Sequence, residues 1–387
     1  MKGQPTKSSN AAAVAVAPAD KYVTWAIFGL AAIGIVAVYS AIEFLAETKA
    51  GGDTERFLLR HVMRLAMALG GVYVFSRIDY HKAAKLARPA LIVSLGLLAA
   101  VQIVGEVSGG AARWLRIGSF GFQPSDLAKV ALILYVALLL AQKQEYVKEF
   151  TRAFLPILTW ILATVVLIGL EDLSSAALVL CSTLIMCFIA RVSTVQLAGL
   201  AVAGAVLAAG LLMVSPNRAA RLESYLGLKI FPHTSEEQVF NNQDEGYQAQ
   251  QARIAIALGG VTGVGPGKST QRDFLPAPYN DFIFAIIAEE YGLAGAFLLL
   301  GLLVVFLFRG LLRVARRAPD PLGLFVAVGF SVMVALYGFI HAGVSTGLLP
   351  VTGLPMPFVS YGGTSMVASG LMLGILLNIS RQVEAGR

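Results

Sequence analysis

The sequence is poor in charged residues. Only 14% of its 387 residues are Asp, Glu, Lys or Arg, whereas 57% are hydrophobic. The mean hydropathy is +0.73. Soluble domains carry about 25% charged residues. This shortage excludes a water-soluble globular enzyme and a disordered tail protein. It also excludes a nucleic-acid-binding protein, despite the net charge of +7, because the charges lie between apolar runs.

Cysteine is almost absent. The two cysteines, Cys181 and Cys187, lie six residues apart in one apolar run, which places them on different faces of a helix. That geometry excludes a disulfide between them, and no His or Asp stands near them to complete a metal site. We interpret both as small packing residues.

Long apolar runs are abundant. A helix needs about 20 residues to cross the ~30 Å hydrocarbon core of a membrane, so these runs predict an all-α, polytopic membrane protein. The ten predicted spans are 22–45, 57–76, 89–105, 125–142, 153–170, 173–190, 193–214, 281–308, 321–346 and 363–380. The seventh and eighth are separated by a long loop, residues 215–280.

Lys and Arg define the expected orientation. Placing the N-terminus inside puts 17 of them in cytoplasmic segments and 5 in the short outer loops, as the positive-inside rule favours. We therefore expect both termini in the cytoplasm and the 215–280 loop outside. Residues 1–20 resemble a signal peptide only weakly, and we expect a disordered cytoplasmic tail there. Residues 21–382 are expected to form one ten-helix domain, and 383–387 a second cytoplasmic tail.

The outer loop before the fourth span leads into a polar helix start. Pro124 suits the first turn of a helix, with Ser125 and Asp126 beside it. Lys129 then lies about one turn inside the membrane, where a lysine is costly. Two interpretations stay open for Lys129: a structural pair, or a group facing a wet cavity.

The long loop contains two recognisable segments. Residues 246–260 predict an amphipathic helix at the membrane interface. Residues 263–270, Gly-Val-Gly-Pro-Gly-Lys-Ser-Thr, look like a phosphate-binding loop, but the spacing is one residue short and no strand precedes it. We therefore do not interpret this segment as a nucleotide site.

Three acidic residues stand at or inside the start of the eighth span. Asp281 is placed either to cap that helix or to act as a general base at the membrane boundary. Glu289 and Glu290 lie about 12 Å deeper, as functional acids or as polar partners of Lys129 or Arg64. Further on, residues 347–365 carry prolines and glycines that predict a re-entrant turn bordering a site.

These motifs, taken together, resemble the SEDS family (shape, elongation, division and sporulation), whose members FtsW and RodA are peptidoglycan glycosyltransferases. The blocks that carry the resemblance are 122–129 (Phe-Gln-Pro-Ser-Asp-Leu-Ala-Lys), 246–248 (Gly-Tyr-Gln), 275–284 and 347–363. The stretch 266–281 is more similar to the cell-division member, FtsW.

The chain departs from the family pattern at several positions. Asp126 replaces the usual Glu, and Asp172 sits in Leu-Glu-Asp-Leu-Ser instead of Gln-Pro-Asp-Leu-Gly. His341 stands where Asn is common, and we interpret it as a polar packing residue. Gly370 and Gly374 form a small-xxx-small pair that predicts close helix packing.

The resemblance implies a reaction and a set of site residues. The 4-hydroxyl of one lipid II sugar would attack C1 of the growing glycan strand and release undecaprenyl diphosphate, with Asp281 as the base and with Lys129, Arg113 and Arg64 as cations. The candidate substrate-binding residues are Arg64, Arg113, Trp114, Gln123, Ser125, Asp126, Lys129, Asp172, Tyr247, Gln248, Ser360 and Tyr361.

The resemblance also implies partners. These are a class B penicillin-binding protein (a transpeptidase), bitopic divisome proteins for a division member, and membrane lipid. The location implied is the bacterial cytoplasmic membrane, at the septum for an FtsW-type chain. The sequence requires no cofactor, although Mg²⁺ or Mn²⁺ would suit the diphosphate. The alternatives are a RodA-type elongation polymerase, a lipid II flippase and a scaffold for the transpeptidase.

Overall fold

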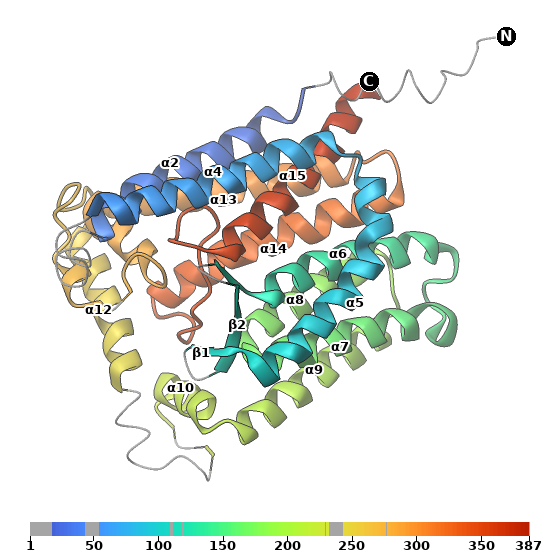
Figure 1. Cartoon of the computed structure of the whole chain (residues 1–387), viewed down its shortest axis with the longest axis horizontal. Helices are drawn as coiled ribbons and strands as arrows, with labels where there is room; N and C mark the ends of the chain where they lie inside the picture. Colours follow the sequence, from blue (N-terminus) through green and yellow to red (C-terminus); the bar gives the residue numbers. More distant parts are fainter. Residues whose placement is uncertain are drawn as a thin grey trace.

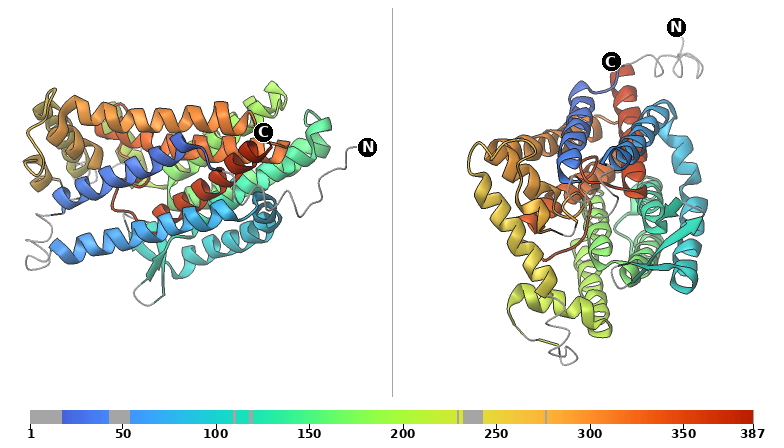
Figure 2. Two further views of the ribbon diagram at one scale, coloured as in Figure 1. Left: turned by 90° about the horizontal axis from the view of Figure 1, so that it is seen from above. Right: turned by 60° about the vertical axis from the view of Figure 1, so that its left-hand side comes forward.

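The computed structural model is a bundle of long helices. It describes residues 18–42, 54–108, 111–117, 120–228, 230–231, 243–275 and 277–386. The start of α2 (Lys21–Ala41) and the end of α15 (Thr364–Ala385) lie at one end of the bundle, and α10 (Pro216–Leu226) and α12 (Gln243–Gly259) lie at the other (Figures 1 and 2).

Each predicted span corresponds to an apolar helix. Nine helices are long and apolar enough to cross a membrane in the part of the chain that the structure describes, and α8 is a shorter apolar helix. The ten are α2 (Lys21–Ala41), α4 (Thr54–Arg77), α5 (Tyr80–Val104), α6 (Pro124–Gln142), α7 (Leu155–Glu171), α8 (Leu173–Ile189), α9 (Thr194–Val214), α13 (Ile283–Arg309), α14 (Pro321–Ser345) and α15 (Thr364–Ala385). The chain is therefore an all-α, multi-pass membrane protein, as predicted.

Some predicted boundaries are wrong. The third helix begins at Tyr80 and not at residue 89, because the Asp79 side chain accepts the His81 N–H at 3.0 Å and caps it there. Pro89 lies inside the helix. Short π-helical turns, η2 (Phe150–Phe154) and η4 (Gly310–Ala315), extend α7 and α13.

A small sheet between α5 and α6 was not predicted. Strands β1 (Glu106–Ser108), β2 (Ala111–Ile117) and β3 (Phe120–Phe122) form it in the order β1-β2-β3. Both pairings are antiparallel, with Glu106 opposite Trp114 and Leu115 opposite Phe122. The sheet lies at the ends of α5 and α6 (Figure 1) and fixes the direction of Arg113 and Trp114.

The 215–280 loop is largely helical. It contains α10 (Pro216–Leu226), α12 (Gln243–Gly259) and the short 3-10 turn η3 (Gln271–Asp273). The predicted helix near 246–260 is confirmed, but its amphipathic character is not. Ala252 and Ala255 are buried, while the larger Ile254 and Leu258 are exposed.

Glycines let α4 and α15 approach closely, as predicted from the small-xxx-small pair. A Cβ at Gly370 would overlap the carbonyl oxygen of Ala68, and one at Gly374 would press on the Val72 carbonyl. The contact aligns α4 with the helix that follows the re-entrant segment.

Orientation can be tested by thiol labelling. Leu228 is 62% exposed after α10, so Leu228→Cys in a chain lacking Cys181 and Cys187 should react with an impermeant maleimide added to intact spheroplasts. A matched cysteine at Glu145, an exposed residue in the α6–α7 connection, should react only after the membrane is opened. The reverse pattern would contradict the charge-based orientation.

Candidate active site

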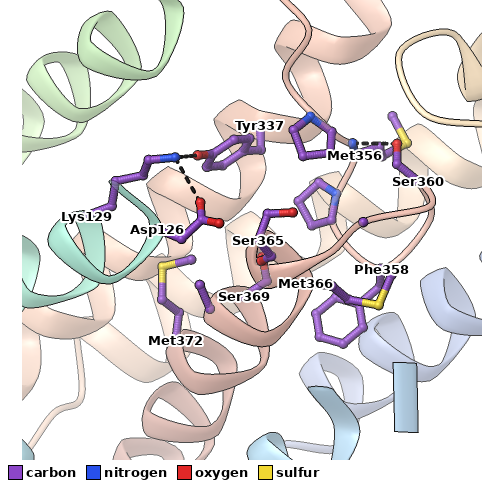
Figure 3. Close-up of a pocket in the computed structure, with 14 residues that line it drawn as sticks. Asp126, Lys129, Tyr337, Met356, Phe358, Ser360, Ser365, Met366, Ser369 and Met372 are labelled. Carbon is purple, nitrogen blue, oxygen red and sulfur yellow. Dashed lines mark hydrogen bonds and ion pairs between the residues drawn. The ribbon is translucent and has the colours of Figure 1, made fainter. Parts of the chain in front are cut away.

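Lys129 is the centre of a buried polar network. Its ammonium donates to Asp126 Oδ1 at 3.1 Å, to the Ser175 hydroxyl at 3.3 Å and to the Tyr337 hydroxyl at 2.7 Å. Figure 3 shows the contacts with Asp126 and Tyr337. The Lys129 side chain is only 5% exposed. Its three N–H donors are therefore all used within the protein, joining α6, α8 and α14.

Two carboxylates complete this network. Asp126 also accepts the Thr364 hydroxyl at 2.7 Å, which ties α6 to the start of α15. Asp172 caps α8 by accepting the Ser174 N–H at 3.0 Å, and it accepts the Ser175 hydroxyl at 2.7 Å. The structural interpretation of Lys129 thus has direct support from its contacts.

A pocket opens beside Asp126, Lys129 and Tyr337. It contains about 390 Å³ of empty space, including the part open to solvent, and its other wall is the segment from Pro355 to Met372 (Figure 3). This segment begins in the predicted re-entrant turn, where residues 348–363 contain no helix or strand. His341 Nδ1 lies 2.8 Å from the Leu354 carbonyl, in agreement with a packing role.

Asp281 lies in the turn that precedes α13. Its N–H donates to the Ala277 carbonyl at 3.2 Å, and its carboxylate accepts the Asn280 side-chain amide at 2.9 Å. The helix begins at Ile283, with Phe282 as the N-cap residue and no side-chain cap. Asp281 is therefore not the N-cap residue of α13, contrary to the capping interpretation, and it lies half-buried in the turn before the helix.

The re-entrant segment holds the Asp281 turn in place. The Ser360 hydroxyl donates to the Asn280 carbonyl at 2.8 Å, and the Tyr361 N–H donates to the Tyr279 carbonyl at 2.9 Å. Phe282, next to Asp281, is fully buried. Burial, followed by the negative charge of Asp281, raises the pKa of Tyr279. The position of Asp281 is thus fixed from both sides of the turn.

α4 approaches the same turn through Tyr361. The Arg64 guanidinium lies over the Tyr361 ring, 4.8 Å from its centroid. His61 stacks on that ring at 5.7 Å, and Tyr279 meets it edge-on at 5.5 Å. Arg64, Ser360 and Tyr361 therefore meet at the turn that carries Asp281.

The sheet positions the other candidate site residues, those of the loop before α6, near the end of α7. Arg113 Nε donates to the Glu171 carbonyl at 2.9 Å and satisfies one of the last carbonyls of the helix. The indole ring of Trp114 lies against Gly363, at the start of α15. Gln123 precedes α6, and its carbonyl accepts the Asp126 N–H at 3.1 Å. The Ser125 hydroxyl is buried and has no hydrogen-bond partner among the residues that the structure describes.

Tyr247 and Gln248 are not brought to this site. Both lie on α12, where Tyr247 is 44% exposed. Among the described residues, neither side chain contacts the Lys129 ammonium or the Arg64 guanidinium. Their assignment to substrate remains a prediction.

The glycine-rich segment 263–270 binds a carboxylate of the chain itself. Glu289 accepts the Ser269 hydroxyl, the Thr270 N–H at 2.9 Å, the Thr270 hydroxyl at 3.0 Å and the Gln271 N–H at 3.3 Å. Glu290 accepts the Ser40 hydroxyl of α2. Neither acid contacts Lys129 or Arg64 in these interactions, so the predicted pairing is wrong.

A break in α13 adds backbone hydrogen bonds to the contact between this helix and the glycine-rich segment. Gly292 has a φ of 64° and interrupts the helix. Nearby backbone groups bond to the preceding loop instead, since Val264 N–H donates to the Glu289 carbonyl and Leu293 N–H to the Gly260 carbonyl, both at 3.0 Å. We call residues 259–272 with Glu289, Glu290 and Gly292 the α13 clamp.

The clamp predicts a specific loss of stability. In Glu289→Gln one carboxylate oxygen becomes an NH₂ group that faces donors, so we expect unfolding to become easier by about 1–3 kcal/mol. Amide hydrogen exchange at Thr270 and Gln271 should accelerate with it. Glu145→Gln, at an exposed position, serves as the control, and equal exchange in both variants would contradict the clamp.

Several site residues were missed by sequence reasoning. Tyr337 and Ser175 lie inside apolar helices, where single hydroxyl groups give a weak signal. His61 was overlooked as part of an ordinary span. The one available clue was the spacing of His61 and Arg64 along a helix, which places them on the same face.

A metal centre would need clustered ligands. The part of the chain that the structure describes contains no group of three or more His, Cys, Asp or Glu residues placed to hold an ion.

Comparison with known proteins connects this geometry to a family. Residues 21–385 match the model of the FtsW, RodA and SpoVE family, described as "cell cycle protein". The chain is 35% identical over 91% of its length to stage V sporulation protein E of Bacillus subtilis, covering 94% of that protein. It is also 35% identical over 92% of its length to the probable peptidoglycan glycosyltransferase FtsW of Geobacter metallireducens, covering 92% of that protein.

Solved structures show the same fold. A chain from a peptidoglycan synthase complex that coordinates polymerization and crosslinking superposes with a TM-score of 0.70 and 26% identity, over 94% of this chain and 98% of that one. A mutant of the rod shape determining protein RodA of Thermus thermophilus superposes with a TM-score of 0.68 and 25% identity, over 94% and 97%.

Proposed function

Because this chain belongs to the FtsW, RodA and SpoVE family, we propose that it is a peptidoglycan glycosyltransferase. It polymerises lipid II into glycan strands at the outer face of the membrane. The similarity to proteins named for this activity extends over more than nine-tenths of the chain. The observation that carries the proposal is the placement of Asp281.

The Asp281 carboxylate suits a general base. It is half-buried, it lies outside the helix, and its turn is held by the hydrogen bonds from Ser360 and Tyr361. In the proposed reaction the acceptor hydroxyl attacks C1 of the donor sugar, Asp281 takes the hydroxyl proton, and the C1–O bond to the diphosphate breaks. The diphosphate leaves with the bonding electrons. A fixed base of this kind contributes about 10²–10⁴ in rate.

Lys129 has a different role in this proposal. Its three donors are satisfied by Asp126, Ser175 and Tyr337, so it organises the floor of the pocket and does not bind the diphosphate directly. The pocket beside it, bordered by the re-entrant segment, is where we place the sugars.

The finer assignments follow the relatives. We place the chain in the bacterial cytoplasmic membrane, with a class B penicillin-binding protein as its transpeptidase partner. The similarity to a chain of a synthase complex supports such a partner. The FtsW-named relatives support a role in division, at the septum and with bitopic divisome proteins. A RodA-type role in elongation is the alternative.

A polymerisation assay tests the function. The purified full chain, with and without a co-purified class B transpeptidase, is incubated with lipid II and the product is separated by gel electrophoresis. We expect glycan polymer. Lipid II movement across vesicle membranes without polymer would instead indicate a flippase, and transpeptidase binding without either activity would indicate a scaffold.

A further inference from the structure

Two arginines from different loops hold the outer end of α7. Arg218 of α10 donates to the Gly169 carbonyl at 2.7 Å and to the Leu170 carbonyl. Arg113 of β2 donates to the Glu171 carbonyl at 2.9 Å. The last four carbonyls of a helix have no partner within it, and its C-terminal end attracts positive charge. The two arginines therefore satisfy three of these four carbonyls and stabilise the end of the helix.

A single residue, Asp172, joins α7 to α8. Its N–H donates to the Ile168 carbonyl at 2.7 Å, which is the fourth of these carbonyls. Its carboxylate accepts the Ser174 N–H at 3.0 Å and the Ser175 hydroxyl at 2.7 Å. The Ser175 hydroxyl also accepts a hydrogen bond from the Lys129 ammonium at 3.3 Å. A displacement of the end of α7 would therefore move the Asp172 carboxylate and, through Ser175, the groups around Lys129.

Electrostatic interactions connect the same groups. The Glu171 carboxyl group is fully buried, and among the described residues it has no hydrogen-bond partner. It lies within electrostatic range of both Lys129 and Arg113, and Asp172 lies within range of Arg218. Interactions between buried groups are screened much less than those at the surface. The turn between α7 and α8 is thus coupled to the Lys129 network by charge as well as by hydrogen bonds.

Arg218 itself is separate from the pocket. Lys129, Asp126 and Tyr337 line the pocket, but none of its lining residues among those described comes from α10. Arg218 is half-buried in the first turn of α10, where the long outer loop leaves α9. Its planar guanidinium donates to two adjacent carbonyls, a geometry that the single ammonium of lysine does not reproduce.

We propose that Arg218 is a positioning residue for the transfer reaction. Together with Arg113 it fixes the turn between α7 and α8. Asp172 and Ser175 then keep the Lys129 ammonium in place at the floor of the pocket. This inference rests on the proposed glycosyl transfer and adds a residue of the long loop to those that shape its site. Arg218 does not contact the substrate in this role and acts through the turn alone.

Kinetics on lipid II with the purified full chain test this role. In Arg218→Ala we expect kcat to fall about 10-fold, because a small displacement of positioned groups is enough for such a loss. KM for lipid II should stay within about twofold, since Arg218 does not line the pocket. Arg218→Lys keeps a cation at the helix end, so its kcat should lie between. Lys268→Ala, which removes an exposed cation of the same loop, should change neither constant. An unchanged kcat in Arg218→Ala would overturn the proposal.

A double variant tests whether Arg218 acts through Ser175. Ser175→Ala removes the hydroxyl that connects Asp172 to Lys129. In that background Arg218→Ala should lower kcat by less than about twofold further, because the connection is already broken. Losses that multiply would mean that Arg218 acts independently of the Lys129 network, and they would overturn the proposal. If the alanine chain melts at a lower temperature, Arg218→Lys takes its place in the same comparison.

Amide hydrogen exchange at Ser174 reports on the turn without any activity. Its N–H donates to Asp172, so exchange should accelerate in Arg218→Ala and stay unchanged in Lys268→Ala. Unchanged exchange in Arg218→Ala would contradict the role of Arg218 in holding the turn. The two proposals therefore fail in different ways. An unmodified chain that makes no polymer contradicts the glycosyl transfer, whereas normal kcat and normal exchange in Arg218→Ala contradict the positioning role alone.

Discussion

Replacing Asp281 with Asn should abolish glycan synthesis in a protein that folds normally. Asn fills nearly the same volume and still accepts a hydrogen bond, so the bond from Asn280 can be kept. It cannot take a proton. The polymerisation rate should therefore fall by about 10²–10⁴, while the melting temperature should stay the same because Asn keeps the size of the side chain and its acceptor oxygen. The rate is measured on lipid II, with melting followed in detergent.

Two further variants serve as comparisons for Asp281→Asn. Asp281→Glu keeps the carboxylate but displaces it by about one methylene, and we expect trace activity from it. Asp273→Asn, at an exposed acid of the η3 turn, should polymerise normally. Near-normal polymer from Asp281→Asn would end the assignment of Asp281 as the base.

Lys129→Met should destabilise the fold and remove activity together. The lysine is 5% exposed on its side chain and pairs with an equally buried Asp126. Removing one partner of a buried ion pair typically costs about 3–5 kcal/mol, because the other charge is stranded. Thermal or denaturant unfolding in detergent measures the loss, and polymerisation should decline in parallel.

A second substitution distinguishes the effect of leaving the Asp126 carboxylate unpaired from the effect of losing the Lys129 ammonium. Asp126→Leu in the Lys129→Met background removes the unpaired carboxylate, so we expect much of the lost stability to return. The double variant should still be inactive, since the floor of the pocket has changed. A Lys129→Met chain that melts normally but makes no polymer would instead make Lys129 a direct ligand of the diphosphate.

The helices could be predicted because the membrane imposes their length. A run of about 20 apolar residues predicts a membrane-spanning helix, and all the spans were found for that reason. The Asp79 cap and the small sheet were not found, since they depend on local hydrogen bonds and pairing within a short polar loop. Such contacts leave little trace in the hydropathy of a sequence.

The candidate site was predicted unevenly. Asp281 and Ser360 fall in polar, proline-rich segments that stand out from their surroundings. Tyr337, a partner that decides the role of Lys129, comes from a helix about two hundred positions later in the chain. Glu289 shows the same limit, because its partner segment has the composition of a phosphate-binding loop and only the fold reveals that the anion is internal.

The break at Gly292 divides α13 into parts with different neighbours. Before it, residues from Ile283 to Glu290 are all buried in protein. After it, Phe297 and Leu298 are 67% and 59% exposed. A helix adapts to a thicker or thinner bilayer by tilting. We expect any change of tilt to be taken up after the break, where one side of the helix is exposed, because the part adjoining Asp281 is held by the α13 clamp. We therefore expect the reacting groups to keep their depth when the bilayer thickness changes.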